Sequence, residues 1–184
     1  MEALVGRLGP RSMPAQPSAA GIGFTATIAL MQLSDIFLRL GEENFERMLR
    51  SVALGKLRTY QLFDAFKTRL HVQKLNTETL KKIGPRTWAR LQEEGSADLA
   101  TELAQAVLIS HMDMIQAVLN DLGIPHQDGF FEKDADLSKF LADGWQQRAW
   151  SKFQASYPPA ALLFYLNHLG WEVGKADDVF LPAA

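Results

Sequence analysis

The sequence contains no cysteine. That absence excludes disulfide bonds, cysteine-ligated zinc, iron–sulfur clusters and thiol nucleophiles, and it fits a reducing compartment, so we expect a cytoplasmic location. With 184 residues, of which 47% are hydrophobic, the chain is long enough to form one domain with its own core. Neither a covalent nor a metal cross-link is therefore needed for stability.

Several catalytic and ligand-binding motifs are also missing. The sequence has no glycine-rich phosphate loop, no Gly-x-Ser-x-Gly turn and no His-Glu-x-x-His helix. Residues 134–145 begin like a calcium-binding loop, but Lys139 stands where glycine is needed and Trp145 where a bidentate glutamate is needed. No enzyme class follows from these motifs, and the sequence favours a protein that is not an enzyme.

Long hydrophobic runs are scarce. The run over residues 22–33 includes two threonines and a glutamine, and it is too short and too polar to be a transmembrane segment. Residues 1–23 are rich in proline, glycine, alanine and serine, and we expect a disordered leader there. Translation that starts at Met31 instead of Met1 would explain the same pattern.

Charge is distributed unevenly along the chain. Residues 47–90 carry eleven basic and two acidic side chains, whereas residues 91–184 carry five basic and fourteen acidic ones. The total charge of −2 therefore hides one segment of +9 and one of −9. Such a division is typical of an anion-binding surface, or of two parts of a fold that pack with complementary charge. Glu43 and Arg47 stand four residues apart, as do Glu46 and Arg50, so both arginines are expected to pair locally.

Helical periodicity dominates from residue 33 onward. Apolar side chains recur with the 3.6-residue period of amphipathic helices, and no repeat of fixed length appears. We predict an all-α protein, a single irregular bundle of about seven or eight helices over residues 24–170. It has a basic half at 47–90 and an acidic half at 91–170, and an irregular tail follows at 171–184.

The longest periodic stretch, residues 99–122, predicts a central helix around which the others pack. Ser96 precedes it as an N-cap, and Gly123 and Pro125 follow it as stop signals. Its apolar stripe is wide enough for two or more neighbouring helices, and the stripe includes His111.

A candidate anion site lies in the basic half. Gly84-Pro85 predicts a new helix start, because proline is favoured in the first turn. Arg86, Thr87 and Arg90 would then lie beside free backbone N–H groups and could bind an anion. A plain helix turn with surface arginines fits the same residues.

Residues 124–136 form the one substantial loop predicted between helices. Asp128 and Gly129 mark a turn in this loop. The two phenylalanines that follow, Phe130 and Phe131, are expected to anchor the loop in the core.

Histidines and aspartates supply the remaining candidates. His111 and His168 lie on apolar helix faces, whereas His126 stands two residues before Asp128 in an extended segment whose alternate side chains point the same way. No cofactor is indicated, but convergence of these four residues would suit zinc, iron or manganese. The His126–Asp128 pair alone would suit general-base catalysis. Alternatively, the two helical histidines are hydrogen-bonded core side chains.

These observations lead to two functional hypotheses. The first is an interaction or scaffold protein that contacts an acidic partner, or a second copy, through the basic 47–90 half. A protein partner is favoured over nucleic acid, because basic side chains flank an apolar stripe on both edges instead of gathering on one face. The alternative is a small enzyme or ligand-binding protein with a site near His111, His126 and Asp128. Aromatic side chains of the acidic half would then line a small-molecule pocket, or else form the core.

Overall fold

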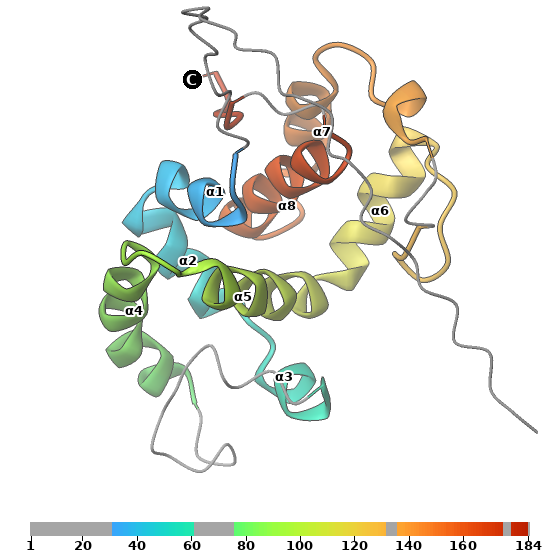
Figure 1. Cartoon of the computed structure of the whole chain (residues 1–184). Coiled ribbons are helices and arrows are strands. Elements are labelled where there is room, and N and C mark those ends of the chain that lie inside the picture. The colour runs from blue at the N-terminus through green and yellow to red at the C-terminus, as the bar shows by residue number, and fades with distance from the viewer. Residues whose placement is uncertain (1–30, 61–75, 132–135, 175–177, 184) are drawn as a thin grey trace, which may run out of the picture.

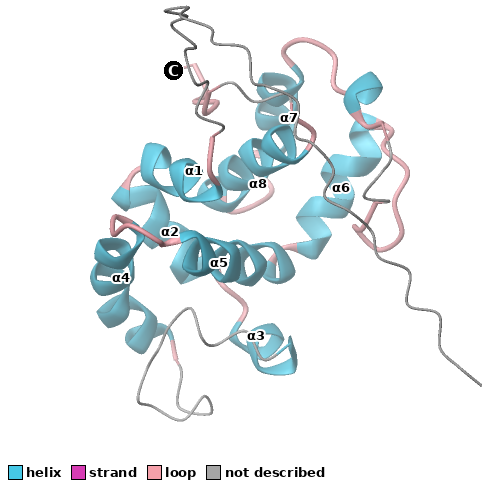
Figure 2. Cartoon of the chain, viewed as in Figure 1, coloured by secondary structure: helices cyan, strands magenta, loops and turns pink. Residues whose placement is uncertain are grey.

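The computed structural model describes residues 31–60, 76–131, 136–174 and 178–183. Within these ranges the chain is helical and contains no β-sheet, which confirms the all-α prediction (Figure 2). None of the helices in these ranges is long and apolar enough to cross a bilayer. The predicted leader at 1–23 and the centre of the basic half at 61–75 lie outside the described residues. The elements are α1 (Leu33–Leu40), α2 (Glu42–Ser51), α3 (Leu54–Tyr60), α4 (Thr77–Leu91), α5 (Ala97–Ser110), α6 (Met112–Leu122), the 3₁₀ helix η3 (Ser138–Phe140), α7 (Trp145–Phe153) and α8 (Pro159–Glu172).

Cap chemistry explains several helix ends. Asn76 precedes α4, and its side-chain oxygen accepts a hydrogen bond of 2.8 Å from the backbone N–H of Thr79. Gly123 ends α6 in the left-handed conformation with φ of 70°, which glycine adopts without steric cost. The predicted stop at Gly123 is therefore confirmed.

Helix α8 is the centre of the bundle. Every side chain from Ala160 to Asn167 is buried, and the helix packs against α1, α2 and α7 (Figure 1). The ring of Phe164 stacks on Phe37 of α1 with the ring centroids 4.5 Å apart. Such all-round burial is typical of a helix enclosed by its neighbours. The central helix of the bundle is therefore α8, and not the helix predicted over residues 99–122.

The prediction of one continuous helix over residues 99–122 is wrong. The chain breaks at His111, with φ of −124° and ψ of 36°, and α5 and α6 run in different directions (Figure 1). Ser110 Oγ accepts a hydrogen bond of 2.9 Å from the backbone N–H of Ala53, and His111 Nε2 lies 3.0 Å from Ser51 Oγ. These contacts hold the break against the connection from α2 to α3. The apolar period continues through the break and therefore conceals it.

Segments at both ends of the described chain attach to α8. The indole N–H of Trp171 donates a hydrogen bond of 2.7 Å to the backbone carbonyl of Met31, just before α1. Residues 178–183, which contain no helix, contact Asn167 of α8 and Arg39 of α1. The part of the predicted tail that the structure describes is thus irregular from 178 onward, but α8 itself extends to Glu172.

Candidate functional site

A tight hairpin follows α6. The backbones of Gln127 and Phe130 exchange two hydrogen bonds, of 2.8 and 2.9 Å. Between them, Asp128 and Gly129 have φ values of 53° and 91°, the positive values that a type I′ turn requires at both central positions. The turn predicted at these two residues is confirmed.

His126 holds this turn against α6. The backbone N–H of Gly129 donates to Nδ1 of His126 over 3.1 Å, so that Nδ1 carries no proton. The proton then lies on Nε2, which donates over 3.2 Å to Oδ1 of Asn120 near the end of α6. Both ring nitrogens of His126 thus form hydrogen bonds within the chain. This arrangement gives His126 a role in holding the loop and leaves neither nitrogen for a metal or a substrate.

Gly129 packs directly on α6. A Cβ atom at this position would lie 2.7 Å from Cε of Met112 and 3.3 Å from Cγ2 of Ile115. Gly95 also has a positive φ, of 80°, but a Cβ there would meet no atom within 4 Å. A side chain introduced at either glycine would therefore meet the same backbone strain, but only at position 129 would it also crowd neighbouring atoms.

We expect Gly129→Ala to lower the free energy of unfolding more than Gly95→Ala. Both substitutions place a side chain at positive φ, which costs about 1–2 kcal/mol. Crowding against Met112 and Ile115 should add about 1–3 kcal/mol for Gly129 alone. Urea denaturation of the two variants measures the difference. Equal losses would show that the contact between the turn and α6 contributes nothing.

Phe130 points away from the core. Its side chain is 64% exposed, whereas Gly129 is buried against α6 and Phe131 packs on the core. Neighbouring residues of an extended segment point to opposite sides, so the inward direction of the Phe131 side chain directs that of Phe130 outward. The expectation that both phenylalanines anchor the loop is wrong for Phe130.

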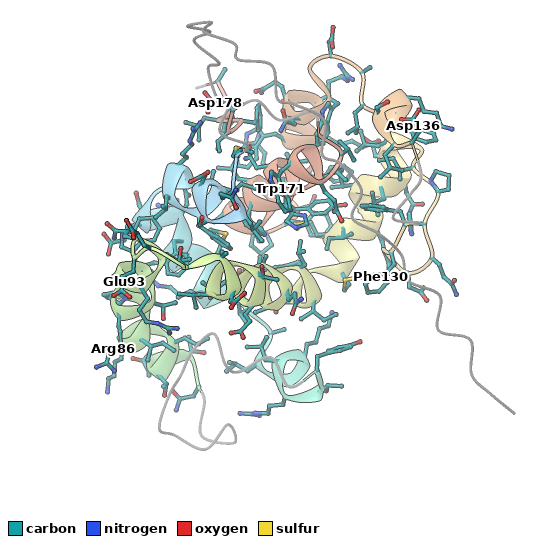
Figure 3. The ribbon with its side chains drawn as sticks, viewed as in Figure 1. Arg86, Glu93, Phe130, Asp136, Trp171 and Asp178 are labelled. Carbon is teal, nitrogen blue, oxygen red and sulfur yellow. The ribbon has the colours of Figure 1, made fainter. Side chains whose placement is uncertain are left out.

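The hairpin forms one wall of an open groove of about 830 Å³. Residues 136–140, which include η3, form the other wall. Figure 3 labels one lining residue of each wall, Phe130 and Asp136. The ammonium group of Lys139 lies 5.1 Å from the ring centroid of Phe140, within range of a cation–π interaction. The other residues that line the groove are Pro125, His126, Gln127, Asp128, Phe131 and Leu137. The groove thus combines aromatic surface with charges of both signs.

The helix start predicted at Gly84-Pro85 is wrong. Helix α4 runs through this pair, with Pro85 inside it, because Leu80 before the proline and Leu91 after it are both buried. Thr87 is 1% exposed, and its hydroxyl donates to the carbonyl of Ile83 over 3.0 Å. The candidate anion-binding residues Arg86, Thr87 and Arg90 therefore lack the helix N-terminus on which that hypothesis rested.

His111 is a buried, hydrogen-bonded histidine at the α5–α6 break. The hydroxyl of Ser51 donates to the carbonyl of Met48 over 2.8 Å, so its oxygen accepts the proton on His111 Nε2. Burial lowers the pKa of His111; Asp113 raises it and Lys56 lowers it further, both by smaller amounts. One of the two interpretations of His111 expected a core histidine of this kind.

His168 lies between aromatic rings on α8, with its side chain only 12% exposed. Its ring centroid lies 5.8 Å from that of Phe164 and 5.7 Å from that of Trp171, and burial lowers its pKa to about 4. Nδ1 lies 3.7 Å from a carboxylate oxygen of Glu172, too far for a hydrogen bond, and finds no hydrogen-bond partner among the described residues. At Nδ1, therefore, these residues do not supply the hydrogen bond expected of a core histidine.

The four candidate metal ligands are not brought together. His111 lies at the α5–α6 break, His126 and Asp128 lie in the hairpin, and His168 lies on α8. Within the ranges given above, no group of three or more histidine, aspartate or glutamate side chains is placed to hold a metal ion. The described geometry thus offers no centre for zinc, iron or manganese at these residues.

Comparisons of the chain with protein-family models, with curated proteins and with solved structures find no match.

Proposed function

We propose that this protein is an interaction protein, and that the groove beside the 126–130 hairpin is its contact surface. The observation that carries the proposal is Phe130, a large aromatic side chain that is 64% exposed to solvent. Phenylalanine, like tyrosine and tryptophan, is enriched in protein–protein interfaces relative to the rest of the protein surface. An aromatic side chain held outward at a groove is well suited to enter a pocket of a partner.

The hairpin supports this role because it is preorganised. The two Gln127–Phe130 backbone bonds, the His126–Gly129 bond and the contact of Gly129 with α6 all restrain the backbone that carries Phe130. A surface that is ordered before binding loses less conformational entropy when a partner docks. Asp128 and Lys139 provide the polar rim that interfaces of this kind have.

Local ion pairs favour the groove over the basic 47–90 half as the contact surface. Arg47 pairs with Glu43 at 2.5 Å, Arg50 with Glu46 at 2.6 Å, and Lys81 with Glu78 at 2.7 Å. Each pair lies within one helix, and the first two were predicted from sequence. Cations that already have carboxylate partners offer less to an acidic partner or to nucleic acid.

Site-specific photo-crosslinking tests the proposal. A benzophenone amino acid at position 130 should form a discrete protein adduct in cells of the source organism. Tyr60, which is 57% exposed on α3 in the basic 47–90 half, is the matched control position and should form none. An adduct of twice the chain mass would identify a second copy as the partner. Equal labelling from both positions would contradict the proposal.

A further inference from the structure

We propose that α8 carries a slot for a short extended peptide, and that residues 178–183 occupy this slot as a built-in ligand which a peptide segment of a partner protein replaces. None of the residues that form the slot lines the groove beside the hairpin. The slot and the groove are thus separate surfaces of the molecule. Figure 1 shows this segment, in red, above α1.

Asn167 is the centre of the slot. Its amide NH₂ donates to the carbonyl of Phe180 over 3.0 Å, and its amide oxygen accepts from the backbone N–H of Phe180 over 2.6 Å. The second amide hydrogen is used by the carbonyl of Leu163, 2.9 Å away within α8. Asn167 is fully buried, so its side chain depends on an occupant of the slot for two of its three hydrogen bonds.

The flanks of the slot add a charge and a second polar contact. Arg39 of α1 forms an ion pair with Asp178, two residues before Phe180 (Figure 3). Oε1 of Gln147 on α7 accepts from the backbone N–H of Ala183 over 3.4 Å. Three helices thus contact this six-residue segment, at Asp178, Phe180 and Ala183.

The chemistry of these contacts defines the ligand. Both hydrogen bonds from Asn167 go to the main chain of one residue, a mode in which the backbone gives affinity and side chains give specificity. The side chains of Val179 and Phe180 pack on the core, whereas Leu181 is 60% exposed. The matching ligand is an extended peptide with a carboxylate two residues before a half-buried aromatic side chain.

Residues 178–183 are held in a way that permits exchange. Arg39 and Asp178 are 51% and 78% exposed, and ion pairs between exposed side chains contribute little. Besides its contacts with Asn167 and the core, the occupant is tethered, and a short tether gives an effective concentration on the order of millimolar. A partner peptide must therefore be present above that concentration, or have a higher affinity for the slot than the resident segment has.

Fluorescence anisotropy with a labelled peptide of residues 178–183 tests the slot in the full chain. Phe180→Ala should weaken the binding of the resident segment to the slot, because the substitution removes apolar contact. The affinity of this variant for the added peptide should therefore be about tenfold higher than that of the original chain. Adding Arg39→Ala to this variant should weaken peptide binding several-fold, whereas adding Arg148→Ala should leave it unchanged. Arg148 is an exposed arginine that contacts the carbonyl of Asp143 instead.

Two results would overturn the proposal. One is the absence of peptide binding to a Phe180→Ala chain whose circular dichroism shows the native helix content. The other is dimerisation of the original chain, detected by light scattering, that Phe180→Ala abolishes. The occupant would then be the segment of a second copy and not a partner peptide.

Discussion

Phe164→Ala should lower the free energy of unfolding by about 3–5 kcal/mol. Phe164 is fully buried on α8, where its ring stacks on Phe37 of α1. The substitution removes that aromatic contact and leaves a cavity between helices that cannot fully close. Urea denaturation monitored by circular dichroism measures the loss.

Phe130→Ala is the matched control, because it deletes the same atoms from an exposed position. We expect a change of at most about 0.5 kcal/mol, as for most substitutions on a protein surface. Similar losses at the two positions would mean that Phe130 is a core residue. The groove would then lack the exposed aromatic side chain on which its proposed role depends.

Acidification from pH 6.5 to pH 4 should destabilise the fold by about 3 kcal/mol through His168 alone. Burial lowers the pKa of His168 from the ordinary 6.5 to about 4 in the folded chain. Between these values the unfolded chain binds more protons than the folded one, so the free energy of unfolding falls as the pH falls. The contribution of His168 is fully present above pH 6.5 and is lost as the pH approaches 4.

His168→Phe isolates this contribution, because phenylalanine fits among aromatic rings and does not titrate. Urea denaturation at intervals from pH 7.5 to pH 4 should show a steeper loss for the original chain than for the variant. Burial also lowers the pKa of His111. Because His111 is present in both proteins, its contribution to the pH dependence cancels in the comparison. Parallel pH profiles would contradict a buried, neutral His168.

Local chemistry made much of the fold predictable. The 3.6-residue period and the stop signal at Gly123 act over a few residues, and the structure has both. The break at His111 was not predictable in this way. Its hydrogen-bond partners, Ser51 and Ala53, lie about 60 residues earlier in the chain, and no glycine or proline marks the position.

The candidate site was predictable in part. The Asp128-Gly129 pair predicted the turn, but the burial of Gly129 against α6 and the outward direction of Phe130 depend on tertiary packing.

The slot on α8 had one signal in the sequence. Asn167 is a polar residue within an apolar helix, and a buried amide needs hydrogen-bond partners. What the sequence could not supply was the identity of those partners.

The position of α8 at the centre of the bundle has a consequence for synthesis on the ribosome. Met31 and Trp171, which hydrogen-bond to each other, are separated by 140 residues. At about 5–20 residues per second, roughly 7–30 s pass between the translation of these two residues. The face of α1 that Phe164 covers therefore stays open while most of the chain is translated. A nascent chain with this topology is a natural client for chaperones, and its bundle closes only after the last helix emerges.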